Sequence, residues 1–292
     1  MANLKEIRSR ITSVNSTRQI TSAMKMVSAA KLRRAQDAVV QMRPYALKLK
    51  EILTNVSATL DSSDGIYSTQ REVKNVLIIA VNSNRGLCGG FNNNIIKASN
   101  ILIKQQEGAK VKVFSIGKKA YDLYKKTSHH PDGSYPETPY IVYESLNFSK
   151  IAAFADVIME KFKNGEIDKV ILVYNSFKNA ASQVVMEEQY LPVAPPVHQG
   201  NKKAVAVDYL YEPNKEDIIK DLIPKSLKIQ LYKAVLDSNA SEHGARMTAM
   251  HKATDNATDL LKELKLTYNK ARQAAITNEI LEIVGGAEAL KG

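Results

Sequence analysis

Both ends of this chain are long segments that almost lack helix-breaking residues. Residues 4–60 contain Pro44 and no glycine, and residues 225–284 contain Gly244 and no proline. Because glycine and proline disfavour the α-helix most strongly, both segments are predicted to be helical. At about 1.5 Å of rise per residue, such helices would be roughly 85 and 90 Å long. A compact domain of this chain length is only about half as wide. We therefore expect these helices to lie against each other or against a partner.

The N-terminal segment carries apolar residues at heptad spacing, which predicts a coiled coil. One set is Leu4, Ile7, Ile11 and Val14, and a second is Ala35, Ala38, Met42, Tyr45, Leu49, Ile52 and Val56. Between them the same frame holds Arg18, Thr21, Lys25 and Ser28, while Ile20, Met24 and Val27 occupy other positions. This pattern predicts that the apolar face shifts in mid-helix, as a stutter would produce.

Two prolines are expected to interrupt the terminal helices. Pro44 lies inside the second apolar set, where a proline costs about 3 kcal/mol unless the helix bends or restarts, so we expect a bend near Arg43. Pro224 follows Pro213 closely. This spacing predicts a short helix before the long C-terminal one.

The C-terminal helix changes character along its length. It begins with large apolar residues (Leu227 and Leu231, then Ala234) and later carries Leu260, Leu264 and Tyr268. Its middle is rich in small residues, which would let another helix approach closely: Ser238, Ala240, Ser241, Gly244, Ala245, Thr248, Ala249, Ala253 and Ala257. Its end is strongly apolar from Ile276 to Leu290. Chain ends are usually polar, so this end is expected to be covered by another molecule.

Residues 70–200 alternate strand-like and helix-like segments, which is typical of an α/β domain with a largely parallel sheet. The predicted strands are Asn75–Val81, Val111–Ile116, Tyr140–Tyr143, Lys169–Tyr174 and Ser182–Leu191, the last of them antiparallel. The predicted helices cover residues 93–106, 117–126 and 149–163, with Ser149 as the N-cap of the third.

Together these patterns predict an α/β plus coiled-coil protein. The N- and C-terminal helices would form an antiparallel coiled coil, and a Rossmann-like α/β domain would be inserted between them. The expected boundaries are residues 1–60 for the N-terminal helix, 70–205 for the α/β domain and 213–292 for the C-terminal helix.

The positive charge of the chain is concentrated at its N-terminus. The formal net charge is +11, and residues 1–60 hold eleven basic residues against three acidic ones. A basic helix face indicates an acidic partner surface, nucleic acid or anionic lipid. Lys31, Arg33 and Arg34 could also bind DNA as a basic zipper does. A basic zipper, however, places its basic region before a parallel leucine zipper with no inserted domain, so we expect no nucleic-acid partner.

Several classes of site have no support in the sequence. Cys88 is the single cysteine, which excludes an intramolecular disulfide and makes a zinc site improbable. His129 and His130 stand beside Pro131 and Gly133 and indicate a loop. No apolar run approaches the roughly 20 residues that span a bilayer. No catalytic triad or acid–base pair emerges, so we expect no catalytic residue, cofactor or metal in this chain.

The glycine-rich segment Asn82–Gly90 follows a predicted strand and precedes a helix, which is where α/β folds bind phosphate groups. Its sequence matches neither G-x-G-x-x-G nor the P-loop. The alternative is a tight turn that needs the positive φ of glycine, and we favour this interpretation. Cys88 lies in the same segment, where a role as a nucleophile has little support.

Three motifs resemble the gamma subunit of bacterial F-type ATP synthases. They are AMKMVSAAKLRRA (residues 23–35) followed by Arg43-Pro-Tyr45, the turn at residues 82–90, and YNKARQAAITNEILEIVGGA (residues 268–287). The resemblance covers the whole chain in order. Because the chain begins near the usual bacterial start, the basic first helix is expected to belong to the mature protein rather than to a transit peptide, which its composition also resembles.

The resemblance implies a function. The two terminal helices would form the central-stalk rotor shaft of a proton-translocating ATP synthase. That shaft would lie inside a hexamer of alpha and beta subunits, with the α/β domain resting with epsilon on the membrane c-ring. Rotation would drive the catalytic beta subunits through their conformations in ATP synthesis or hydrolysis. The chain itself would be non-catalytic and peripheral, at the cytoplasmic face of the bacterial inner membrane.

The same resemblance implies contact residues for the beta subunits. They are Met24 and Lys25 on the first helix and Arg272, Gln273 and Thr277 on the second, with Glu279 and Glu282 holding the contact region together.

Overall fold

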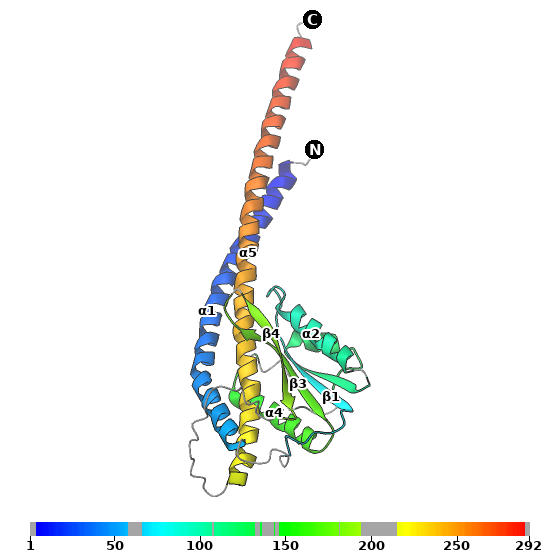
Figure 1. Ribbon diagram of the computed structural model, residues 1–292. Helices are drawn as coiled ribbons and strands as arrows, with labels where there is room; N and C mark the ends of the chain where they lie inside the picture. Colours follow the sequence, from blue (N-terminus) through cyan, green and yellow to red (C-terminus); the bar gives the residue numbers. More distant parts are fainter. Residues whose placement is uncertain are drawn as a thin grey trace, which may run out of the picture. The chain divides into compact units, whose positions relative to one another are not determined.

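The computed structural model describes residues 4–57, 66–106, 108–131, 135, 143, 146–180, 182–193 and 215–289. These residues form two compact units. The helical unit comprises residues 1–28 and 247–292, and the α/β unit comprises residues 29–246. Helix α1 (Leu4–Ser57) and helix α5 (Lys215–Ala289) each contribute to both units (Figure 1).

The α/β unit is built on one four-stranded mixed sheet with the strand order β2-β1-β3-β4. The strands are β1 (Asn75–Val81), β2 (Lys110–Ile116), β3 (Lys169–Phe177) and β4 (Gln183–Leu191). Strand β1 pairs in parallel with both β2 and β3, and β4 runs antiparallel to β3. Four of the five predicted strands, the antiparallel one among them, are therefore confirmed. The predicted strand at Tyr140–Tyr143 falls, apart from Tyr143, outside the described residues.

Helices cover both faces of this sheet, which explains why β1 and β3 are almost continuously apolar. Helices α2 (Phe91–Gln105) and α3 (Lys118–Tyr124) pack on one face, where Ile95, Ala120 and Tyr124 meet Ile78. Helix α4 (Phe148–Lys163) and residues 227–235 of α5 pack on the other (Figure 1). The N-terminal part of the α5 sequence is thus part of the core of the α/β unit.

In the helical unit, α1 and α5 run antiparallel. The Thr254 hydroxyl donates a hydrogen bond to the Thr21 hydroxyl at 2.9 Å. One turn farther along α1, Lys25 Nζ lies 3.4 Å from His251 Nδ1. As the number on α1 rises, the number of its partner on α5 falls, so the predicted antiparallel pairing is confirmed here.

The predicted shift of the apolar face of α1 is wrong. Ile20 and Val27 are 60% and 56% exposed, whereas Thr21 and Ser28 are buried. One heptad frame continues through the helix, and all its positions are buried or half-buried: Ile7, Ile11, Val14, Arg18, Thr21, Lys25, Ser28, Leu32, Ala35, Val39, Met42, Ala46 and Leu49. Tyr45, a predicted member, is 60% exposed. Polar residues can occupy buried positions of this heptad frame because short hydroxyl side chains form hydrogen bonds within their own helix. Ser28, for example, donates to the Met24 carbonyl.

Three other local expectations need correction. Helix α5 begins at Lys215 and continues through Pro224, so the short helix predicted before Pro224 is the first part of α5. Helix α1 continues through Pro44, and the bend expected near Arg43 stays a prediction. The N-cap of α4 is Asn147, whose side chain accepts from the Ser149 backbone amide at 3.2 Å, and not Ser149 itself. In the part of α5 that belongs to the helical unit, Leu261 is buried, at 6% exposure, whereas Leu260 is 44% exposed.

Candidate functional site

The glycine-rich turn at residues 82–90 joins β1 to α2, and its polar groups are largely engaged within the protein. The Asn92 side chain accepts from the Ser83 backbone amide at 3.0 Å and donates to Ser83 Oγ at 2.8 Å and to Cys88 Sγ at 3.2 Å. Ser83 Oγ also donates to the Arg85 carbonyl at 2.6 Å. This network favours the structural interpretation of the turn over a phosphate cradle.

Three backbone positions in and near the turn have positive φ angles. Gly89 has a φ of 58°, in line with the expectation that this turn uses glycine for a positive φ. Leu87 has a φ of 61° and its side chain is 63% exposed. Gly117 has a φ of 122°, and a Cβ atom there would overlap the Asn82 carbonyl oxygen. Left-handed conformations of non-glycine residues persist only where the surroundings hold them. In this turn the hydrogen bonds around Ser83 and Asn92 supply that restraint.

Cys88 is an unsuitable nucleophile. Its side chain is 2% exposed and packs with Phe91 and Ala245. Burial raises the pKa of the Cys88 thiol, and the nearby Ser83 hydroxyl and Arg246 only partly oppose this shift. The thiolate, which is the reactive form, is therefore disfavoured.

A buried ion pair on α5 holds the turn, and the sequence analysis missed it. Arg246 lies 2.7 Å from Glu242, and their side chains are 10% and 7% exposed. Arg246 also donates to the carbonyls of Arg85 and Gly86 at 3.3 Å. Burial raises the pKa of Glu242, and Arg246 opposes that rise. Burial, with Arg246 and Lys31, lowers the pKa of His243 to about 4, so this imidazole is neutral at physiological pH.

The sequence did contain a signal for this contact. Glu242 and Arg246 are spaced i, i+4 and flank Gly244 in the small-residue segment of α5. At Gly244 a Cβ would come within 3.2 Å of the Ala180 carbonyl, and Ser241 Oγ donates to the Asn175 carbonyl at 3.0 Å. The small residues were predicted to admit a helix. At Gly244 and Ser241, however, the small side chains allow the backbone of β3 and of the β3–β4 connection to pack closely against α5.

The predicted partner-contact residues all lie in the helical unit, at two levels. Met24 and Lys25 are half-buried, and Lys25 faces His251. Arg272, Gln273, Thr277, Glu279 and Glu282 are exposed on the last turns of α5. His251 and Arg272 are 21 residues apart, about 30 Å along a helix. The structure therefore does not gather the seven residues into one site.

The end of α5 extends beyond the first residue of α1 (Figure 1). From residue 276 to 289 every residue is exposed. The large apolar residues here are 47–70% exposed: Ile276, Ile280, Leu281, Ile283 and Val284. Contiguous exposed apolar surface of this kind marks a binding surface.

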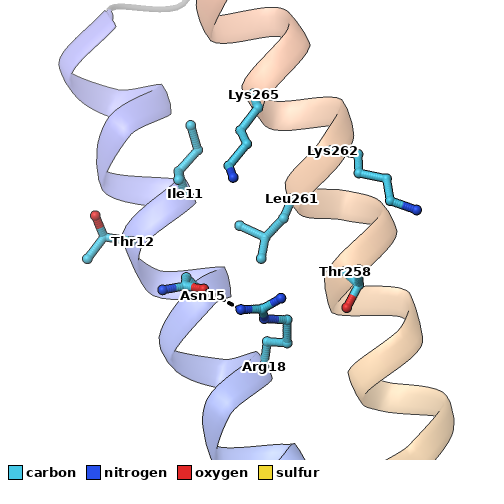
Figure 2. A pocket seen from close by; sticks show the side chains of 8 residues that line it. All are labelled: Ile11, Thr12, Asn15, Arg18, Thr258, Leu261, Lys262 and Lys265. Carbon is cyan, nitrogen blue, oxygen red and sulfur yellow. Dashed lines mark hydrogen bonds between the residues drawn. The ribbon is translucent and has the colours of Figure 1, made fainter.

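A groove lies between α1 and α5 within the helical unit. It has a volume of about 330 Å³ and is lined by Ile11, Thr12, Asn15, Arg18, Thr258, Leu261, Lys262 and Lys265. Figure 2 shows Arg18 and Lys265 directed into the space between the helices, whereas Lys262 points away from it.

Other site types find no support among the described residues. No group of three or more His, Cys, Asp or Glu side chains there could hold a metal ion. None of the described helices is both long and apolar enough to cross a membrane.

Comparison with known proteins agrees with this architecture. The chain is 62% identical to the ATP synthase gamma chain of Flavobacterium johnsoniae and 47% identical to that of Chlorobium phaeobacteroides, each over the full length of both chains. Its fold matches a chain of the Euglena gracilis mitochondrial ATP synthase with a TM-score of 0.67, 24% identity and coverage of 98% of this chain and 94% of that one. A chain of the Tetrahymena thermophila central stalk and c-ring gives a TM-score of 0.55 at 24% identity, covering 80% of this chain and 99% of that one.

The sequence model of one family, described as ATP synthase, matches residues 3–290. The full-length relatives are gamma chains of this enzyme, and the paired terminal helices with an inserted sheet are the fold of the matched structures. The chain therefore belongs to the ATP synthase family, as one of its gamma chains.

Proposed function

We propose that this chain is the central-stalk rotor shaft of a proton-translocating ATP synthase. The exposed apolar end of α5 carries this proposal, because an exposed apolar surface of this size indicates a partner that covers it. Apolar contact is non-directional, so such an end can turn against its surroundings without breaking specific bonds. A hexamer of alpha and beta subunits would surround this end.

The other partners follow from the family. The α/β domain, residues 70–205, would contact epsilon and the membrane c-ring, and residues 1–60 and 213–292 would form the two shaft helices. The complex would lie at the cytoplasmic face of the bacterial inner membrane, with this chain bound peripherally. The chain would couple rotation of the c-ring to conformational changes in beta.

We assign no catalytic role to this chain. Two groups near the glycine-rich turn that could act chemically are buried in the fold. The Cys88 thiol is buried with a raised pKa, and Glu242 is engaged by Arg246. ATP synthesis and hydrolysis would take place on the beta subunits.

The seven predicted residues would contact beta at two levels. At one level Met24 and Lys25 would meet beta beside the Thr21–Thr254 hydrogen bond. At the other level, Arg272 and Gln273 would donate hydrogen bonds to beta. Thr277, whose hydroxyl donates to the Gln273 carbonyl at 2.9 Å, would accept one, and Glu279 and Glu282 would order this region. Arg272 has five guanidinium donors, so it is the strongest candidate for a directional contact.

Reconstitution tests the proposal. Purified chain is added to alpha and beta subunits, and co-elution with a hexamer is measured together with ATPase activity. In membranes depleted of this subunit, the chain should restore proton-driven ATP synthesis. Failure to co-elute and to restore synthesis would exclude the shaft role.

The contact residues need a separate variant. Arg272→Ala combined with Gln273→Ala should lower ATP turnover while the complex still assembles. Lys270→Ala, an exposed change on the same helix, is the matched control and should leave turnover unchanged. Equal turnover in all three proteins would remove the contact assignment but not the shaft role.

A further inference from the structure

The groove between α1 and α5 contains two cationic side chains without an acidic partner. The Arg18 guanidinium donates a hydrogen bond to Asn15 Oδ1 at 3.2 Å. Among the described residues, no carboxylate lies within 4.0 Å of the charged nitrogen atoms of Arg18 or Lys265. The other lysine of the groove, Lys262, is paired with Asp259 at 3.1 Å. The groove therefore has two uncompensated positive charges.

The remaining lining side chains are apolar or already hydrogen-bonded within the chain. Asn15 uses its oxygen to accept from Arg18, and Figure 2 shows its nitrogen directed away from the space between the helices. The Thr12 and Thr258 hydroxyls donate to the carbonyls of Arg8 and Thr254 in their own helices. Leu261, 6% exposed, forms the floor of the groove with Ile11 (Figure 2).

We infer that this groove binds a phosphate group. Two unpaired cations match the charge of about −2 that a phosphate carries at neutral pH. Arg18 and Lys265 would each donate to a different phosphate oxygen, and the guanidinium fork suits phosphate geometry. A carboxylate would neutralise only one of the two cations. The ligand is inorganic phosphate or the phosphate chain of a nucleotide.

The site is separate from the proposed contacts with beta. It shares none of the seven contact residues, and its binding is a property of the chain alone. The shaft role and this site can therefore fail independently.

Phosphorus NMR of the full-length chain tests the inference. Inorganic phosphate is titrated at constant, low ionic strength, because salt screens exposed charges. We expect saturable binding at about 10 mM or less, since so small a ligand in an open groove binds weakly. A parallel titration with ATP distinguishes a nucleotide phosphate chain from free phosphate. The triphosphate carries more negative charge and more acceptor oxygens than one phosphate, so it should bind more tightly if the phosphate chain is the ligand.

Variants in the groove identify the site. Lys265→Gln and Arg18→Gln should each weaken binding about tenfold, the effect of losing one charge-assisted hydrogen bond. Lys262→Gln is the matched control, because Lys262 lines the same groove but is paired with Asp259 and points away (Figure 2). Asn15→Asp would place a carboxylate beside Arg18 and should abolish binding.

Three results would overturn the inference: no saturable binding, equal losses in Lys262→Gln and Lys265→Gln, or displacement of phosphate by acetate at equal concentration. The last would reveal general attraction of anions rather than a phosphate site. Lys265 is exposed, so its variant keeps the test valid even if the half-buried Arg18 variant fails to fold. Circular dichroism verifies the helix content of each protein.

Discussion

At the scale of single residues, a few polar side chains determine how α5 fits into the α/β unit. Arg246 joins α5 to two carbonyls of the glycine-rich turn, and Ser241 joins it to β3. Removing one partner of a buried ion pair leaves an uncompensated charge, which typically costs 3–5 kcal/mol. The Glu242–Arg246 pair is therefore a point where one substitution would loosen the turn from the helix.

Asp237, 8% exposed on the same part of α5, makes stability depend on pH. Burial raises its pKa above the ordinary value of 3.8, and Lys233 and Arg43 oppose the rise while Glu188 adds to it. A carboxyl whose pKa is higher in the folded state contributes stability at low pH, and this stability is lost as pH rises through the folded pKa. Asp237→Asn should therefore be more stable than the parent at neutral pH.

The measurement is urea unfolding over a series of pH values. The advantage of Asp237→Asn should shrink as pH falls and vanish below 3.8, where the parent carboxyl is protonated in both states. A constant difference between the two proteins at every pH would contradict this account.

Gly117 should tolerate no side chain. Gly117→Ala combines a φ of 122° with overlap of the new Cβ and the Asn82 carbonyl, so it should cost more than the roughly 1–3 kcal/mol of backbone strain alone. Gly108→Ala is the control, because Gly108 has a φ of 96° but nothing within 4 Å of a Cβ. Thermal unfolding should rank Gly117→Ala well below Gly108→Ala, and equal losses would rule out the steric contribution.

At the scale of elements, helices depend on local hydrogen bonds at their ends and on packing against distant residues. The N-cap of α4 is a local interaction, in which the Asn147 side chain accepts a hydrogen bond from the Ser149 backbone amide. Asn147→Ala should lower the free energy of unfolding by about 1 kcal/mol. Ser149→Ala, which removes the residue that the sequence suggested as the cap, should change it by less than about 0.5 kcal/mol. The opposite order in chemical denaturation would restore Ser149 as the cap.

The continuous heptad frame of α1 leads to a second prediction at this scale. Ile7 is 4% exposed and Ile20 is 60% exposed. Ile7→Ala should destabilise the helical unit by about 2–5 kcal/mol, as core truncations do, whereas Ile20→Ala should change its stability by less than about 0.5 kcal/mol. Hydrogen exchange of amides in residues 4–28 measures both. Comparable losses of protection would favour the shifted frame that the sequence suggested.

At the scale of the whole molecule, stability and assembly should depend on different surfaces. The α/β unit has its own core on both faces of the sheet. The last turns of α5 contribute exposed apolar side chains and bury none of them within the chain. Substitutions there should therefore affect the complex with alpha and beta rather than the isolated protein.

Ile280→Ser combined with Ile283→Ser tests this separation. The two side chains are 55% and 70% exposed, so the unfolding midpoint of the isolated chain should not change. The affinity for the alpha–beta hexamer should fall, because each isoleucine buried on assembly contributes about 1.5–3 kcal/mol. Analytical ultracentrifugation measures the affinity. A lowered midpoint with unchanged affinity would mean that these residues stabilise the chain instead.

Much of this architecture could be predicted because its signals are local. The buried runs at Asn75–Val81 and Lys169–Tyr174 indicate strands, and the scarcity of glycine and proline indicates long helices. The turn at residues 82–90 was recognisable from its glycines. Its neighbours were not, since Arg246 lies more than 150 residues away along the chain.

By itself, then, the sequence determined the two long helices and the α/β insertion, because periodicity and composition carry these properties. The insertion between the helices indicated their antiparallel pairing, and the motifs at residues 23–35 and 268–287 carried the resemblance to the family. Only the tertiary structure decided which side of α1 is buried, what the small residues of α5 face, and where Arg18 and Lys265 lie together. The physical reason is that burial depends on neighbours distant in sequence. Thr21 and Ser28 look like surface residues, yet the packing of two helices buries them and leaves Ile20 and Val27 exposed.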